Sequence, residues 1–242
     1  MTYSIVARDP GTGHFGVAVA SRFFAVGALV PHIRGGKCAV ATQAFVSPLW
    51  GIEAADRLAA AELPADVLAD LMARDEGRDQ RQIHMIDAAG NIAAHTGAKC
   101  IDWAGQVQGE GVSVAGNMLV GEAVIADTLA AYLDNMDLPL AERLMTAMEA
   151  GEAAGGDKRG KQSAALRIHR GEDYPWIDIR ADDHPDPLPE LRRLYDVAHQ
   201  RYVFVADAMP TRDNFSGVTD RTGIDQAIAE AERKRAAAAV AG

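Results

Sequence analysis

One short segment, residues 15–20, has no polar face, and this feature constrains the fold more than any other in the sequence. Three large side chains, Phe, Val and Val, alternate there with glycine and alanine. A strand of this kind is covered on both sides, as in a sheet that lies inside a layered structure. Alternation over residues 2–7 and the turn-forming run Asp9–Gly13 make it the second arm of a hairpin. The sequence therefore predicts a sheet with further layers on both of its faces.

The rest of the chain alternates groups of strands with pairs of helices. Period-two segments predict strands at residues 37–45, 83–86, 92–95, 112–115, 166–168 and 177–179, and helical spacing follows at residues 47–58, 64–72, 124–133, 140–148 and 191–198. This order differs from the strict strand–helix alternation of a doubly wound parallel sheet. It favours an α+β fold with four layers, α-β-β-α, in which two antiparallel sheets are stacked and each is covered by helices.

Length and charge limit the domain number and the partners. A chain of 242 residues with 48% apolar side chains can bury a large core. We expect one domain over residues 1–206 and a partly helical, exposed extension over residues 207–242. The net charge of -10, from 34 acidic and 24 basic residues, repels phosphate backbones. Nucleic acid is therefore not an expected partner.

The first residues predict neither a signal peptide nor a membrane span, because Arg8 and Asp9 come before any long apolar run. We expect a cytoplasmic protein that does not bind membranes. Cys38 and Cys100 have no second cysteine or histidine at zinc-ligand spacing, so they are expected to be reduced thiols. The seven histidines form no His-x-x-x-His pair, and the chain has no Gly-x-Ser-x-Gly motif. No metal or cofactor is expected.

Thr2 is the first candidate for chemistry. If Met1 is removed, as is usual before a small residue, Thr2 carries a hydroxyl and a free α-amine at the start of a buried strand. A hydroxyl becomes a useful nucleophile when a neighbouring group takes its proton, and an α-amine with a pKa of about 7.7–8.0 can do this near neutral pH. The alternative is an ordinary threonine that begins a strand.

The glycine-rich segment 154–163 is the second candidate, with Asp157 and Arg159 at its centre. Charged side chains between glycines can converge on a ligand there. The segment resembles a phosphate loop, but Gln162 stands where a magnesium-binding hydroxyl is needed, and the order is helix, loop, strand. Nucleotide binding is therefore not expected. The alternative is a solvated connection between a helix and a strand.

Several polar residues stand where the pattern favours apolar ones. Ser21 and Arg22 end the second strand and Gln43 lies in the apolar third strand, so each is expected to bond local backbone or to face a ligand. Asn117 follows a strand, and it is either a donor to an oxyanion or a turn residue. Lys37 could lower the proton affinity of the Thr2 hydroxyl, but we expect it to lie in water.

Long segments of the chain resemble the bacterial and archaeal family called domain of unknown function 1028 (DUF1028). The resemblance extends from Thr2 to about Gln200. The segments that carry it are Thr2–Gly13, Gly16–Gly27, Ala39–Ala44, Gly111–Asn117, Gly155–Ala165, Trp176–Arg180 and Asp182–Pro187. The family is grouped with the N-terminal-nucleophile hydrolases, and their α-β-β-α sandwich agrees with the order of elements above.

The resemblance implies an amidohydrolase-like protein that acts on a small amide or peptide. In that superfamily the first residue of the mature chain is the nucleophile, and this role falls on Thr2. Proteolytic members also use a downstream lysine and aspartate, for which this chain has no clear counterpart at Lys37 or at Ser21 and Arg22. Asn117 would hold the oxyanion and Asp157 would orient groups. The candidate substrate-binding residues are Ser21, Arg22, Gln43 and Arg159.

Two other classes of function remain open. The first is a catalytically silent member of the fold that binds a small molecule or peptide. The second is an interaction subunit whose sandwich mainly supports self-assembly. Members of the superfamily commonly assemble, so the resemblance also implies a homo-oligomer.

Overall fold

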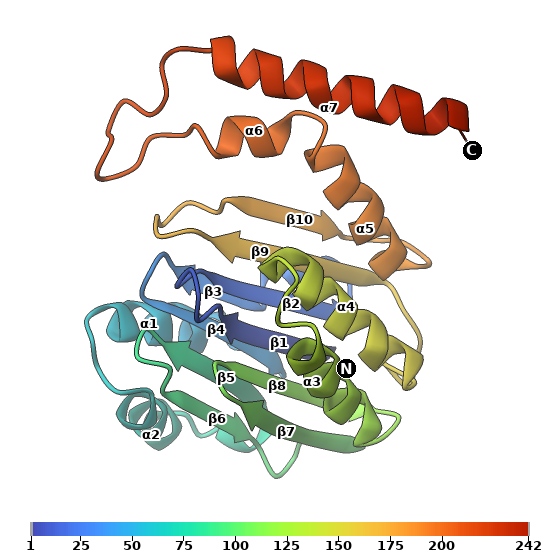
Figure 1. Ribbon diagram of the computed structural model, residues 1–242. Coiled ribbons are helices and arrows are strands. Elements are labelled where there is room, and N and C mark those ends of the chain that lie inside the picture. Colours follow the sequence, from blue (N-terminus) through green and yellow to red (C-terminus); the bar gives the residue numbers. More distant parts are fainter. Residues whose placement is uncertain (1, 242) are drawn as a thin grey trace. The chain divides into compact units, whose positions relative to one another are not determined.

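The computed structural model describes the backbone of residues 2–241 and side chains as far as residue 237 (Figure 1). Met1, whose removal would free the α-amine of Thr2, lies outside the described residues. The chain divides into two compact units, Met1–Leu191 and Arg192–Gly242, and each is described by itself. The domain boundary expected after residue 206 remains a prediction, because a division by packing does not show where an independently folding domain ends.

Two antiparallel sheets form the centre of the first unit. The six-stranded sheet contains β1 (Thr2–Arg8), β2 (Phe15–Ser21), β7 (Trp103–Gly109), β8 (Val112–Leu119), β9 (Ser163–His169) and β10 (Ile177–Ala181), in the order β10-β9-β2-β1-β8-β7. The four-stranded sheet contains β3 (Pro31–Arg34), β4 (Cys38–Ala44), β5 (Arg81–Asp87) and β6 (Ile92–Thr96), in the order β3-β4-β5-β6. The hairpin expected at the start of the chain is the β1–β2 pair, at the middle of the larger sheet.

Helices cover the outer face of each sheet (Figure 1). The helices of the first unit's outer layers are α1 (Pro48–Ala59), α2 (Pro64–Arg74), α3 (Ala123–Asp134) and α4 (Leu140–Ala153). The pair α1 and α2 packs on the four-stranded sheet, and α3 and α4 pack on the six-stranded sheet. Strand β1 faces β4, and β5 faces β8. The predicted fold of four layers with two stacked antiparallel sheets is therefore confirmed.

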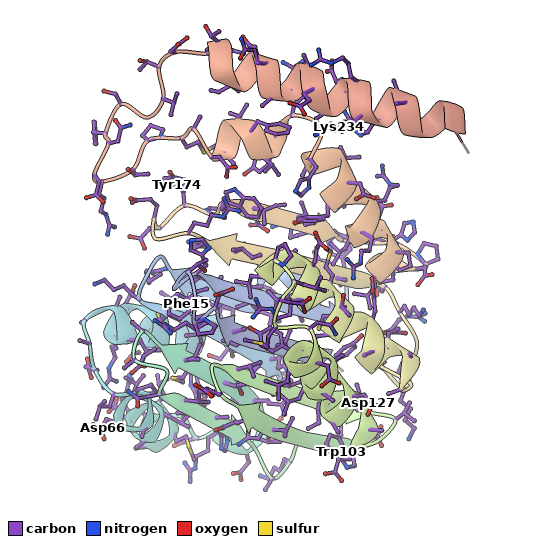
Figure 2. The ribbon with its side chains drawn as sticks, viewed as in Figure 1. Phe15, Asp66, Trp103, Asp127, Tyr174 and Lys234 are labelled. Carbon is purple, nitrogen blue, oxygen red and sulfur yellow. The ribbon has the colours of Figure 1, made fainter. Side chains whose placement is uncertain are left out.

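Strand β2 shows why its sequence has no polar face. Phe15, Val17 and Val19 lie in the core between the two sheets, and Figure 2 labels Phe15 there. On the other face, a Cβ atom added to Gly16 would come within 2.5 Å of the Leu144 side chain of α4. The small residues therefore allow a helix to approach closely, while the large residues fill the space between the sheets.

The second unit is small and helical. Helix α5 (Pro187–Ala198) crosses the division between the units, and α6 (Tyr202–Ala206) and α7 (Thr222–Ala241) follow it. The exposed helix expected near the C-terminus is α7, in which Lys234 pairs with Glu230 at 2.7 Å. None of the helices within residues 2–241 is both long enough and apolar enough to cross a membrane.

A buried histidine connects the two sheets. Both ring nitrogens of His84 in β5 contact hydroxyls of the opposite sheet: Nε2 is 2.8 Å from Ser4 Oγ and Nδ1 is 3.0 Å from Ser113 Oγ. Burial lowers the pKa of His84 from 6.5 to about 3, although a hydrogen bond with the backbone of Ser113 opposes this shift. The folded protein therefore holds His84 in its neutral form at neutral pH.

We expect this histidine to make stability depend on pH. Below pH 6.5 His84 is protonated in the unfolded chain but stays neutral in the folded protein. The free energy of unfolding is therefore highest above about pH 6.5 and decreases as the pH falls towards 3. Between pH 7 and pH 5, this group is expected to remove about 2 kcal/mol from the free energy of unfolding. Urea unfolding at both pH values, with His84→Gln for comparison, measures the effect. An equal pH dependence in the variant would contradict it.

Candidate functional site

The ends of four strands meet at one edge of the sandwich. Thr2 begins β1 and pairs with Ser21 of β2 on one side and with Asn117 of β8 on the other. Gln43 lies near the end of β4, which packs on β1 from the opposite sheet. The fold thus brings together four of the residues that the sequence analysis selected, although they are up to 115 positions apart.

Thr2 is held in place at this edge. Its Oγ1 lies 3.1 Å from Ser21 Oγ, and its backbone carbonyl accepts a hydrogen bond of 3.4 Å from Asn117 Nδ2. Only 7% of the residue is exposed. Alternation along β1 turns Tyr3 the other way, where its hydroxyl donates to Met148 O of α4 at 2.9 Å. Thr2 therefore faces the opposite sheet.

A pocket of about 220 Å³ opens beside Thr2. Most of its lining is apolar, and three polar residues contribute to it. The lining consists of Thr2, Phe23, Val26, Leu29, Val30, Gln43, Ala44, Val46 and Arg159. Phe23 is 51% exposed, so the pocket has an accessible aromatic wall. Such a cavity suits a small ligand with an apolar body and a polar group directed towards Thr2.

Amide side chains form the floor of the site. Gln43 Nε2 donates to Gln82 Oε1 at 2.8 Å, and Asn117 Nδ2 donates to the same oxygen at 3.0 Å. Gln82 Nε2 donates to the carbonyl of Gly116 at 2.8 Å. Gln43, Gln82 and Asn117 are at most 2% exposed. Because Asn117 uses both amide protons on Gln82 and Thr2, its role as an oxyanion donor remains a prediction.

Asp157 fixes the glycine-rich loop to the end of β2. Its Oδ2 accepts from the backbone N–H of Arg22 at 2.8 Å, and its Oδ1 accepts from the N–H of Arg159 at 2.8 Å. Arg159 Nη2 also donates to the Arg22 carbonyl at 3.2 Å, and Arg22 Nη1 donates to the Arg159 carbonyl at 3.1 Å. These bonds hold Arg159 at the pocket, so Asp157 positions the loop through its backbone.

We expect Asp157→Asn to destabilise the protein by about 2 kcal/mol, because one partly buried N–H then faces an amide donor instead of an oxygen of this buried carboxylate. The exposed residue Asp127 on α3, labelled in Figure 2, provides the control. Asp127→Asn is expected to change stability by less than about 0.5 kcal/mol. Urea unfolding of both variants measures the difference. Equal stabilities would contradict the positioning role.

The other candidates lie away from this edge. Lys37 is exposed in the turn between β3 and β4, at the opposite end of β4 from Gln43, as expected for a lysine in water. Cys38 is fully buried under α1, and burial raises the pKa of its thiol to about 11. Within residues 2–237, no group of three or more His, Cys, Asp or Glu side chains could hold a metal ion.

Fold and site together define a class of protein: an α+β sandwich of two antiparallel sheets with a buried threonine at the wall of a pocket. The family model of DUF1028, a family of unknown function, matches residues 2–191. The chain therefore belongs to the DUF1028 family, and the resemblance found in its sequence motifs is confirmed.

Two solved structures are similar to this chain. One is a DUF1028 protein from Silicibacter pomeroyi, with 32% identity and a TM-score of 0.82 over 90% of this chain and 99% of that protein. The other is Anbu, an ancestral β-subunit from Yersinia bercovieri, with 13% identity and a TM-score of 0.41 over 86% of this chain and 98% of that one. The second likeness is too distant to carry an argument. No curated protein sequence matches.

Proposed function

We propose that this protein is an amidohydrolase of the N-terminal-nucleophile class that acts on a small amide or peptide. The observation that carries the proposal is the position of Thr2. Thr2 is the first residue of the central strand β1 and lines the pocket. Ser21 contacts its hydroxyl, and Asn117 donates to its backbone carbonyl. A positioned hydroxyl beside a cavity is the arrangement that nucleophilic catalysis needs.

In this mechanism, removal of Met1 exposes the α-amine of Thr2. The amine takes the proton from Oγ1 as that oxygen forms a bond to the amide carbonyl carbon. The protonated amine then gives its proton to the leaving nitrogen as the C–N bond breaks, and water hydrolyses the resulting ester. Among residues 2–237, no titratable side chain has a hydrogen bond with Thr2 Oγ1, so its own amine is the base available to it.

A backbone N–H at the pocket can serve the developing oxyanion. Val46 lines the cavity beside Thr2, and its N–H has no hydrogen-bond partner among the described residues. The neighbouring N–H of Phe45 is already bonded to Gln80 O at 3.1 Å. Because unpaired donors near a reacting oxygen stabilise the transition state, Val46 N–H is a candidate backbone donor to the oxyanion, beside the predicted donor Asn117.

The pocket indicates which acyl group would bind. Its apolar walls suit a short aliphatic or aromatic group, and Arg159 places a positive charge at the lining. Of the three guanidinium nitrogens of Arg159, only Nη2 makes hydrogen bonds within residues 2–237, so Nε and Nη1 can donate to a ligand. Ser21, Arg22 and Gln43 shape the same edge through their contacts with Thr2, the loop and Gln82.

Covalent labelling tests the proposal. Intact-mass measurement of protein from cells is expected to show loss of Met1, and incubation with a β-lactone probe is expected to add one label. Peptide sequencing should place the label on Thr2. Thr2→Ala should prevent labelling, whereas Ser21→Ala should retain it. Uniform retention of Met1, or a label on any other residue, would reject the nucleophile.

A catalytically silent binding protein is the second candidate. The observation that favours it is the amide of Asn117, which has no proton left for a reacting oxygen. This candidate expects Thr2→Ala to bind the ligand as tightly as the wild type, with no turnover in either protein. Calorimetric titration of both proteins, followed by product analysis, separates the two functions.

Self-association and a cytoplasmic location remain predictions. Light scattering of the purified protein measures the first, and a mass of one chain at all concentrations would reject it. Fractionation of cells that produce the protein measures the second.

A further inference from the structure

A second pocket lies on the other side of the Thr2 site. It has a volume of about 210 Å³. Phe45, Ile101 and Met118 give it apolar walls, and Gln80, Lys99 and Asn117 add polar groups. The segment between β6 and β7 closes it, because the backbone N–H of Met118 donates to Ile101 O at 3.2 Å. The hydrogen bonds among Gln43, Gln82 and Asn117 do not by themselves explain why this cavity is present.

The two pockets meet at the proposed reaction centre. Ala44 lines both of them. Thr2 lines the first pocket and Asn117 lines the second, and these two residues are paired in neighbouring strands. The two cavities are therefore neighbours at this edge of the sandwich, one beside Thr2 and the other beside Asn117.

The backbone is strained at the second pocket. Ala44 ends β4 with φ of 69°, and Met118 lies near the end of β8 with φ of 55°. Non-glycine residues adopt this left-handed region only with backbone strain, and such residues cluster at ligand sites. Here they lie on opposite sheets and line the same cavity. This observation is independent of the volume of the pocket.

From these observations we propose that the second pocket binds the leaving group of the reaction, an apolar α-amino acid with a free carboxylate. The substrate would then be an N-acylated apolar amino acid. Phe45, Ile101 and Met118 would contact its side chain, and the ammonium group of Lys99 would pair with its carboxylate. Lys99 is available, because its side chain is 69% exposed and its ion pair with Asp79 is long, at 3.8 Å. The assignment rests on the proposed function, since the acyl half occupies the pocket beside Thr2.

Cys100 gives a direct test of occupancy, because it lines the second pocket and is half-buried. The experiment follows alkylation of Cys100 by iodoacetamide in Thr2→Ala protein, which cannot turn over a ligand. Cys38 should stay unmodified because it is fully buried. The probes are N-isovaleryl-L-leucine and its amide, N-isovaleryl-L-leucinamide, which lacks the carboxylate.

We expect the acid to protect Cys100 at concentrations about fivefold lower than the amide, the size of a solvent-exposed ion pair. Lys99→Met should remove this difference. Lys37→Met is the matched control, because Lys37 is exposed at the opposite end of β4, and it should retain the difference. Equal protection by both probes, no protection, or the same loss in both lysine variants would overturn the assignment.

The same probe separates this assignment from the proposed function. Processed wild-type protein is mixed with N-isovaleryl-L-leucine, and the release of leucine is measured. Protection without release supports the second pocket and counts against the nucleophile. Release without protection supports the nucleophile and rejects the second pocket.

Discussion

Thr2→Ala is expected to lower the kcat for amide hydrolysis by about a thousandfold or more, because it removes the atom that attacks the carbonyl. Thr2→Ser keeps a hydroxyl at the same place and is expected to retain activity within about tenfold. Alanine and serine are both small, so removal of Met1 should be the same in the two variants. Steady-state kinetics with one amide substrate measures the effect.

A control is needed to show that the loss is chemical. Ser21→Ala removes the hydroxyl that lies 3.1 Å from Thr2 Oγ1 and leaves the nucleophile in place. We expect it to lower kcat by about tenfold, the effect of one lost positioning bond. All three variants should remain folded in urea unfolding, with Thr2→Ala and Ser21→Ala each losing about 1 kcal/mol because their shared buried bond is lost. Undiminished turnover by Thr2→Ala would end the mechanism.

The largest loss of stability is expected for Gln82→Leu. Gln82 is fully buried and accepts bonds from Gln43 and Asn117, while its Nε2 donates to the carbonyls of Gly105 at 3.1 Å and Gly116 at 2.8 Å. Leucine has a similar volume but leaves these groups without a partner. Since each unsatisfied buried group costs about 1–3 kcal/mol, the expected loss is about 4 kcal/mol.

Gln108→Leu is the matched control, because Gln108 is exposed on β7. It is expected to change the free energy of unfolding by less than about 0.5 kcal/mol. Urea unfolding curves of the two variants measure the contrast. If Gln82→Leu unfolded with the same midpoint as Gln108→Leu, the amide floor would be irrelevant to stability.

The layered fold was predictable because residues 15–20 of β2 are buried on both faces and include no polar side chain, and because groups of strands alternate with pairs of helices along the chain. Two strands, β3 and β7, were not predicted from the sequence, and both are edge strands. β3 has the alternating sequence Pro-His-Ile-Arg, and β7 contains two glycines and two glutamines. An edge strand is paired on one side only and tolerates such residues, so it gives no apolar run. The short helix α6 was missed for a different reason, since five residues are too few for helical spacing to show.

The site was predictable only in part. Thr2 was selected because it follows Met1, Asn117 because it follows a strand, and Ser21 and Gln43 because they are polar where the pattern favours apolar residues. The structure places the four together. Gln82 was missed, along with the histidine two positions later, because polar residues alternating with Ile and Met in β5 resemble a solvent-exposed face. Only the opposite sheet makes that face buried, and a single sequence does not show which strands oppose each other.

The direction of the buried hydrogen bonds fixes where protons reside inside the sandwich. Gln43 presents Oε1 to Ser4, whose hydroxyl donates to it at 2.7 Å. Because the Ser4 proton is used on Gln43, Ser4 Oγ can only accept from His84 Nε2, 2.8 Å away, and His84 Nδ1 lies 3.0 Å from Ser113 Oγ. The amide floor beside Thr2 and the buried histidine therefore belong to one continuous series of hydrogen bonds, which runs from Gln82 through Gln43 and Ser4 to His84.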